Sequence, residues 1–292
     1  MLGDKKEITA GDNSTNVQGQ IVNISTGISF ADARDIALQT FIDNFYQLSE
    51  VAKNTALERA ELLVNRFLDK LQKESPDLIG KIVEPDIQYA VINAQKQYAR
   101  SGRIESLELL SQLLKERFQV SEEDSLKRIV VNESIEALTK LTTEHLKFLA
   151  IIFLVKNAKV HNVDNLFHLL SLSMSDKWNL FKDDLPYMNH LVAVGVATND
   201  TIINHLQNFE TIMRNTYEGV LLKDMNPLND TDEIRGFKQK YITNADREKI
   251  LENWNNSILR GFTLTAVGIS LAVTYLVSVM DMQLDIGIWI EN

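Results

Sequence analysis

The chain has 292 residues, of which 45% are hydrophobic and 24% charged, so it is long enough and apolar enough to bury a sizeable core. Its formal net charge of −10 argues against a surface dedicated to nucleic-acid backbones, although a local basic patch is compatible with it. The absence of cysteine excludes disulfides, thiolate nucleophiles and cysteine-ligated zinc, and fits a reducing cytosol for the bulk of the chain.

The first predicted element is a polar β-type segment, residues 1–30. It is rich in Asn, Ser, Thr, Gln and Gly and carries short alternations of β-branched residues. A lone hairpin this polar is marginal in water, and repeating it around a symmetry axis would stabilise it. The segment therefore predicts an oligomerisation element, and the alternative is a flexible polar tail. The residues assigned to oligomerisation are Asn13, Asn16, Val17, Ile21 and Ile24.

Residues 31–225 are predicted to form a helical body. Ser29 followed by Asp32 is typical of a helix start, and apolar residues then recur at three- and four-residue steps. This spacing predicts one long amphipathic helix or a close pair. Small residues at four-residue spacing would let a neighbouring helix approach closely: Ala52, Ala56 and Ala60.

The run KFLAIIFLVK, residues 147–156, places eight apolar residues between two lysines. Crossing a bilayer takes roughly twenty residues, so this run predicts a buried core helix instead. The body is followed by residues 226–260, which are polar with a helical pattern. We interpret that stretch as a helical connector.

Residues 261–280 carry no charge, and as a helix they would be long enough to cross the hydrocarbon layer of a membrane. Lys and Arg precede this run and acidic residues follow it, so the large N-terminal part would be cytoplasmic and the tail, residues 281–292, outside. Small or hydroxyl-bearing residues form a ridge that suits helix packing in lipid or the wall of a pore made by several copies. The ridge consists of Ala266, Ser270, Thr274 and Ser278.

The same run also fits a water-soluble fold. In that interpretation Leu264 ends a strand, Thr265 caps a helix of about four turns, and residues 284–290 alternate like a returning strand. The ridge would then be ordinary packing inside the protein. The sequence favours the membrane helix because large apolar residues face away from the ridge, so the predicted fold is mainly α: a helical body, a short N-terminal β oligomerisation element and one C-terminal transmembrane helix.

No motif in the sequence names a reaction. The five histidines are scattered without metal-site spacing, and no phosphate-binding loop, dinucleotide fingerprint or nucleophile elbow occurs. We therefore expect no enzyme, no cofactor and no metal. A hydrolase would need a cleft in which His145, His168 or His205 meets carboxylates.

Basic residues gather in two places, and both are candidate contacts for single-stranded nucleic acid. The first set has a tyrosine, Tyr98, that could offer a stacking face. The alternative is that the basic residues form solvated faces and balance neighbouring acids. The candidates are Lys96, Arg100 and Arg103 in the first set, and Lys115, Arg117, Lys127 and Arg128 in the second.

Residues 11–52, with LTAVG at 264–268 and DIGIWI at 285–290, resemble a poorly characterised bacterial family. That family opens with a G-x-N-S-T-N-x-Q element and closes with L-T-x-x-G and I-W-I. Some proteins of this general appearance are linked to anti-phage defence. A functional parallel is the Hailong-type transmembrane effector, an oligomeric channel held shut by a nucleic-acid signal from a nucleotidyltransferase partner.

The resemblance implies a homo-oligomer, tetrameric by analogy with the effector, at the bacterial inner membrane. On release from inhibition it would conduct ions or breach the bilayer, as in abortive infection. Its partners would be further copies of itself, inner-membrane lipid, and a nucleotidyltransferase or its single-stranded nucleic-acid product. The alternative function is a cytoplasmic oligomeric scaffold or sensor that binds a protein or nucleic-acid partner, with residues 261–290 as a strand–helix–strand unit.

Overall fold

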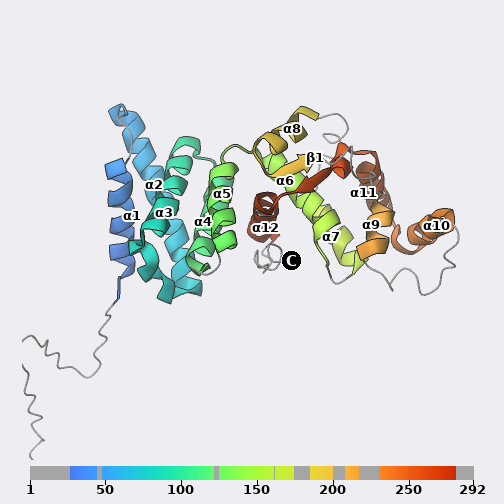
Figure 1. Ribbon diagram of the computed structural model, residues 1–292, viewed down its shortest axis with the longest axis horizontal. Coiled ribbons are helices and arrows are strands. Elements are labelled where there is room, and N and C mark those ends of the chain that lie inside the picture. The colour runs from blue at the N-terminus through green and yellow to red at the C-terminus, as the bar shows by residue number, and fades with distance from the viewer. Residues whose placement is uncertain are drawn as a thin grey trace, which may run out of the picture.

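The protein is mostly helical, which confirms the prediction of a mainly α fold (Figure 1). The computed structural model describes residues 27–44, 48–121, 125–160, 162–173, 185–199, 208–216 and 230–280. Of the predicted N-terminal β-type element, residues 1–26 lie outside these ranges, and so do the tail residues 281–292.

The N-terminal half is a helical bundle in which successive helices run in opposite directions (Figure 1). Its elements are α1 (Phe30–Asn44), α2 (Glu50–Glu74), the 3-10 helix η1 (Pro76–Val83), α3 (Pro85–Ser101), α4 (Ile104–Gln119) and α5 (Ser125–Leu138). The apolar spacing that predicted a long helix or a close pair is thus divided between α1 and α2.

The start of α1 shows the predicted reciprocal cap. The backbone N–H of Asp32 donates to Ser29 Oγ at 3.2 Å, and the backbone N–H of Ser29 donates to Asp32 Oδ2 at 3.1 Å. On α2, the small side chains of Ala56 and Ala60 are buried against α1 and α3, where they meet Phe41. The predicted close helix approach is thus formed by Ala56 and Ala60, whereas Ala52 is exposed.

The C-terminal half surrounds a two-stranded antiparallel sheet. Residue Ala197 of β1 pairs with Leu264 of β2, and Asn199 pairs with Phe262. The elements are α6 (Thr143–Ile152), the π-helix η2 (Phe153–Asn157), α7 (Val163–Ser173), α8 (Leu185–Ala193), β1 (Ala197–Asn199), α9 (Phe209–Thr216), α10 (Asp230–Tyr241), α11 (Ala245–Asn256), η4 (Ile258–Gly261), β2 (Phe262–Leu264) and α12 (Ala266–Met280).

The predicted core helix at residues 147–156 is confirmed as α6 with η2. Every residue from Phe148 to Val155 is buried. The lysine that closes the run, Lys156, donates from Nζ to the carbonyl oxygens of Arg260 at 2.8 Å and Phe262 at 2.7 Å. The Lys156 ammonium group thereby donates to two backbone carbonyls at the start of β2.

Residues 226–260 are more than a connector. The helix α11 buries Ile250, Leu251 and Trp254 in the main core, so this stretch packs as part of the C-terminal half. The sequence indicated a connector because α11 carries many polar residues. Its three apolar side chains are nevertheless enough to pack one face of α11 against the core.

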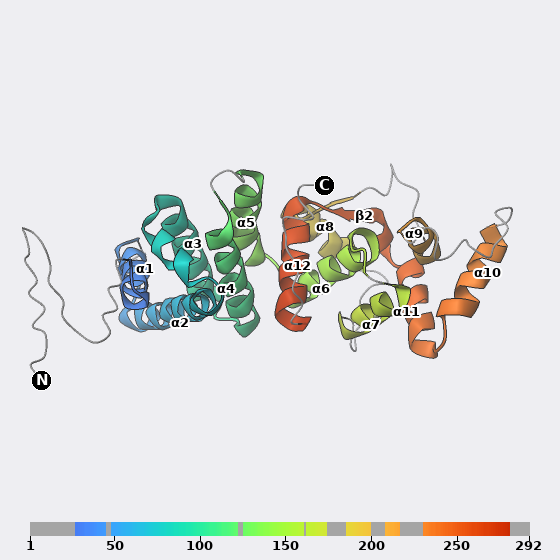
Figure 2. The same cartoon turned by 90° about the horizontal axis from the view of Figure 1, so that it is seen from below.

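The uncharged run forms η4, β2 and the fifteen-residue helix α12. Figures 1 and 2 place α12 between the two halves, where it packs against α4, α5 and α6. The strand, the cap at Thr265 and the helix of about four turns match the alternative interpretation of this run: the backbone N–H of Gly268 donates to Thr265 Oγ1 at 3.2 Å. The returning strand predicted at residues 284–290 lies outside the described ranges.

The transmembrane part of the predicted fold has no support. No helix in the described ranges combines the length and apolar character that crossing a bilayer requires. Because η4 and β2 use the first residues of the uncharged run, α12 has a length of only about 22 Å, against roughly 30 Å of hydrocarbon.

Candidate functional site

A groove of about 670 Å³ lies between α2 and α3. Its floor is aliphatic and its sides are basic or polar. The lining residues are Leu48, Ala52, Thr55, Ala56, Arg59, Lys96, Gln97, Ala99 and Arg100. We call this space the α2–α3 groove; its volume is that of a small-molecule site or of a few nucleotides.

A second space, of about 480 Å³, adjoins the first because Gln97 and Arg100 line both. Its other lining residues are Ser101 at the end of α3, and Thr139 and Lys140 in the connection from α5 to α6. We call it the end hollow. Together the two spaces form one depression that runs from α2 to the α5–α6 connection.

The end of α3 is built to hold Arg59 in the groove wall. Gly102 ends the helix at φ +60°, in the left-handed region where glycine is favoured. A Cβ at this position would lie within 2.4 to 2.7 Å of guanidinium atoms of Arg59. The glycine therefore both ends the helix and leaves room for the guanidinium, whose Nη1 donates to the carbonyl of Ala99 at 2.9 Å.

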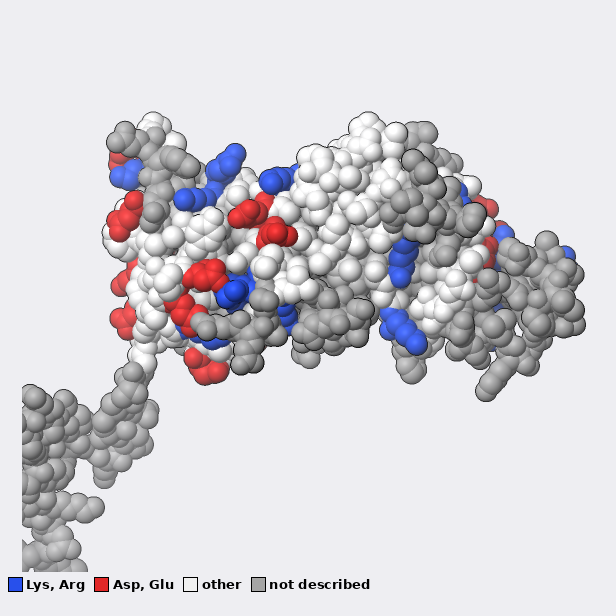
Figure 3. Space-filling model, in the orientation of Figure 1, with Lys and Arg blue, Asp and Glu red and all other residues white. Residues whose placement is uncertain are grey.

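The depression is electropositive. It is lined by Arg59, Lys96, Arg100 and Lys140, and no Asp or Glu is among the described residues lining either space. Three of these side chains, those of Lys96, Arg100 and Lys140, form no ion pair within the described part of the chain. Lys and Arg side chains gather along the upper edge of the N-terminal half in Figure 3, with acidic side chains below them.

The partial negative charges of two helix C-termini weaken the positive field of the depression but do not reverse it. The C-termini of α3 and α5 both lie at the end hollow, and each carries a partial charge of about −0.5. Four cationic side chains outweigh two such ends by about three charges. In a chain of net charge −10, this depression is therefore suited to an anionic ligand.

The structure separates the predicted basic residues into two groups. Lys96 and Arg100 line the groove. Arg103 does not, because its Nη2 donates to the carbonyl of Leu141 at 3.0 Å. Tyr98, predicted to offer a stacking face, is buried in the core, and this burial raises the pKa of its hydroxyl.

The second predicted basic set balances acids, as the alternative interpretation had it. Lys115 pairs with Glu74 at 2.7 Å. Arg117 is almost fully buried and pairs with Asp86, and Arg128 Nε lies 3.9 Å from the same carboxylate. Lys127 also has an interaction partner. These four cations stabilise the bundle and are not available as a free basic surface.

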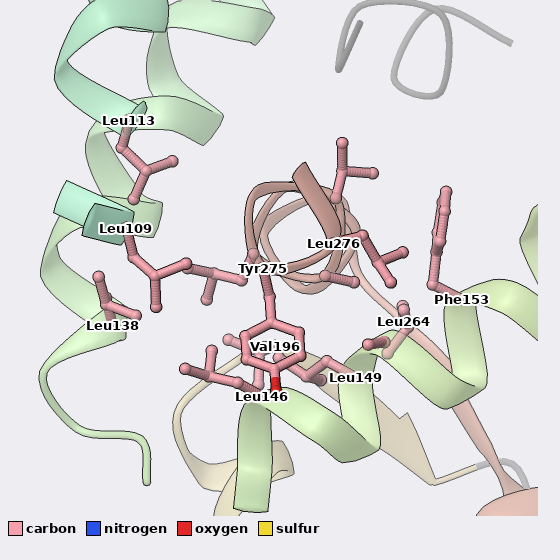
Figure 4. Close-up of a cluster of buried hydrophobic side chains, with 14 of the residues drawn as sticks. Leu109, Leu113, Leu138, Leu146, Leu149, Phe153, Val196, Leu264, Tyr275 and Leu276 are labelled. Carbon is pink, nitrogen blue, oxygen red and sulfur yellow. The ribbon is translucent and has the colours of Figure 1, made fainter. Parts of the chain in front are cut away.

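The ridge residues of the uncharged run do not form a common exposed face. Ser270 and Thr274 are fully buried, whereas Ala266 is partly buried and Ser278 is exposed. Thr274 Oγ1 donates to the carbonyl of Ser270 at 2.8 Å. Figure 4 shows leucines of α4, α5 and α6 around this helix, including Leu109, Leu138 and Leu146. In this structure Ser270 and Thr274 serve helix packing within the protein's own core, and their role in a pore stays a prediction.

Two histidines meet in the C-terminal half. His145 caps α6: the backbone N–H of Thr142 donates to its Nδ1 at 3.0 Å. Its ring lies 5.1 Å from that of His190 and 4.7 Å from that of Tyr187, measured between centroids. Burial, and secondarily His190, lower the pKa of His145. His168 is exposed, and His161 and His205 lie outside the described residues.

Within the described residues no group of three or more His, Asp or Glu side chains could hold a metal ion. The residues predicted for oligomerisation, from Asn13 to Ile24, lie outside the described ranges. Three lining residues were not predicted from the sequence: Arg59, Ser101 and Lys140. Helix packing brings them to the same depression as Lys96 and Arg100. Within their own helices, Arg59 and Arg100 each stand at helical spacing from other groove residues.

The model of a protein family of unknown function matches residues 27–233 and 225–290. The matched ranges include the LTAVG and DIGIWI segments but begin after the polar element at residues 11–18. No curated protein and no solved structure matches the chain.

Proposed function

Because the chain belongs to this family of unknown function, we propose a function from the geometry of the site: it is a non-catalytic sensor or scaffold that binds single-stranded nucleic acid in the α2–α3 groove. One observation carries the proposal. Lys96, Arg100 and Lys140 face one depression without ion-pair partners in the described chain and without a lining carboxylate. Unneutralised cations that share one groove are typical of a site for a polyanion.

The shape of the groove favours a single strand over a duplex. A groove of about 670 Å³ between two helices accommodates a few flexible nucleotides, whereas a duplex presents a broad, stiff surface. The floor offers Leu48, Ala52 and Ala56 as apolar surface for bases. No aromatic side chain lines the groove among the described residues, so the planes of Arg59 and Arg100 are the stacking surfaces we expect.

The resemblance to anti-phage effectors provides a candidate source for the ligand, the single-stranded product of a nucleotidyltransferase. It also favours a homo-oligomer that changes its packing when the strand binds or leaves. A ligand shifts such an equilibrium only by binding one state more tightly than the other. Because the depression formed by the groove and the end hollow borders both α2 and the α5–α6 connection, a bound strand would contact two parts of the bundle whose relative position could differ between such states.

Pore formation stays a prediction from the uncharged run, and we place nucleic-acid binding before it. For α12 to enter lipid, it would first have to leave α4, α5 and α6. That step would expose Leu271, Val273 and Leu276, which are almost fully buried here, together with the apolar surface they cover. Fractionation separates the two functions: a pore-forming protein stays in the membrane pellet after a carbonate wash.

The proposal is tested by fluorescence anisotropy with a labelled deoxythymidine oligonucleotide of about fifteen residues at about 50 mM salt. We expect the full-length protein to bind it, and the double variant Lys96→Gln/Arg100→Gln to bind at least about tenfold more weakly, with a smaller salt dependence. Lys73→Gln removes an exposed charge at the far end of α2 and should change little. Failure of the wild-type protein to bind, or equal binding by the double variant, would contradict the proposal.

A further inference from the structure

The two parts of the depression differ in chemistry. The α2–α3 groove has an aliphatic floor, whereas every residue lining the end hollow bears a hydrogen-bonding side chain. These side chains are the amide of Gln97, the hydroxyls of Ser101 and Thr139, and the cations of Arg100 and Lys140. Hydroxyl, guanidinium and ammonium donors together are the set that proteins use for phosphate oxygens.

One of these donors is both buried and without a partner. Ser101 Oγ is buried and makes no hydrogen bond within the described part of the chain. A buried hydroxyl without a partner is costly, and native structures rarely leave one unexplained. Because this oxygen has almost no accessible surface, the Ser101 side chain would have to rotate toward the end hollow for a ligand oxygen to supply the missing bond.

The far wall of the hollow is fixed. Thr139 and Lys140 belong to the short connection between α5 and α6, and His190 of α8 donates from Nε2 to the carbonyl of Lys140 at 2.7 Å. The connection is therefore tied to the C-terminal half, and it lines the depression at this end. A strand that ends in the hollow would place its terminal phosphate between this connection and Arg100.

We infer that the end hollow is a subsite for the terminal phosphate of the bound strand, held by Arg100, Ser101 and Lys140. This inference rests on the proposed function. A terminal phosphate carries more charge than an internal phosphodiester and has three free oxygens instead of two. The hollow suits both properties, because two cations and two hydroxyls line it.

The test compares three deoxythymidine oligonucleotides of equal length, with a 5′-phosphate, a 3′-phosphate or two hydroxyl ends. We expect one of the two phosphates to tighten binding by about tenfold, since hydrogen bonds to a charged group are worth about that factor. Lys140→Gln and Ser101→Ala should each weaken the phosphate-ended strand more than the hydroxyl-ended strand, and so reduce that preference. Lys96→Gln should weaken all three strands by a similar factor.

The outcomes separate the two proposals. If no strand binds, the proposed function fails and the subsite with it. If all three strands bind equally tightly, or if the preference survives both Lys140→Gln and Ser101→Ala, the subsite is wrong while nucleic-acid binding stands. Lys140→Gln should fold normally, because the Lys140 side chain makes no hydrogen bond in the described structure. The test therefore does not depend on Ser101→Ala folding normally.

Discussion

The hydroxyl oxygens of Ser134 on α5 and Ser270 on α12 lie 2.9 Å apart in the core, 136 positions apart in the sequence. Both side chains are fully buried. This hydrogen bond joins the N-terminal bundle to the C-terminal helix, and it explains why a serine stands in the middle of an apolar run. The Ser270 hydroxyl finds its hydrogen-bond partner within the protein and requires none from water or lipid.

Replacing Ser270 by leucine should therefore destabilise the protein. The larger side chain has no space between α5 and α12, and it removes one of the two hydrogen-bond partners of Ser134, whose other partner is the carbonyl of Val130. We expect the free energy of unfolding in urea to fall by about 1–3 kcal/mol. Ser278→Leu, on the exposed end of the same helix, is the control and should change stability little. A Ser270→Leu protein as stable as the wild type would argue that this face of α12 is not packed as described.

A second prediction concerns the start of α12. A Cβ on Gly268 would lie 1.9 Å from the carbonyl oxygen of Val196, a backbone atom that cannot rotate away. Because that same carbonyl accepts the N–H of Thr265 at 3.2 Å, moving it would disturb the approach of β1 to α12. Gly268→Ala should lower the midpoint of thermal unfolding, by an amount that corresponds to about 1–3 kcal/mol. Gly80→Ala has no atom within 4 Å of the added Cβ and serves as the control.

The mainly α fold could be predicted because local signals agree with the tertiary structure over most of the bundle. The Ser29–Asp32 cap and the run at 147–156 are local patterns, and both form as expected. The environment of the uncharged run could not be predicted in this way. Hydropathy and length describe α12 alone, whereas the choice between lipid and protein depends on α4, α5 and α6, which are distant in sequence.

The site was only partly predictable for the same reason. Lys96 and Arg100 are four positions apart on one helix, so their common face follows from spacing. Arg59 comes from α2 and Lys140 from the α5–α6 connection, and only packing brings them to the same depression. Conversely, Lys115 and Arg117 look like free cations in the sequence, but each has an acidic partner from an earlier element.

The role of that second basic set gives a third prediction. The Arg117 side chain is only 5% exposed, and Asp86, itself 46% exposed, is its acidic partner. Asp86→Asn would leave the buried guanidinium without a countercharge and should reduce the free energy of unfolding by about 1–3 kcal/mol, less than for a fully buried pair because Asp86 is partly solvated. Urea denaturation measures the effect, with the exposed Asp69→Asn as the control.

The same comparison tests the division between structural and ligand-binding cations. Lys96→Gln and Arg100→Gln should leave the urea midpoint nearly unchanged, because neither side chain has an ion-pair partner in the described chain. They should affect ligand binding alone. If Lys96→Gln destabilises the protein as strongly as Asp86→Asn, the groove cations are structural and the assignment of the site loses its main support.

The last prediction is a loss of stability at mildly acidic pH. Burial lowers the pKa of His145 below its ordinary value of about 6.5, and the neighbouring His190 lowers it further. The unfolded chain therefore binds a proton at higher pH than the folded protein does. The stabilising contribution of neutral His145 is complete above about pH 6.5 and is lost as the pH falls through the folded-state pKa. The acceptor geometry agrees, because protonation of Nδ1 would remove the bond from the Thr142 N–H.

We expect the urea midpoint to fall between about pH 7.5 and pH 5.5, and this fall to be smaller in His145→Gln. Glutamine is a suitable replacement because its side-chain oxygen can accept the Thr142 N–H at the third position of the helix, as in an ordinary capping box. His168→Gln removes an exposed imidazole from α7 and should leave the pH dependence as it is in the wild type. Equal pH dependence in His145→Gln and the wild type would assign the acid sensitivity to other groups, and the buried neutral imidazole would then have no measurable share in it.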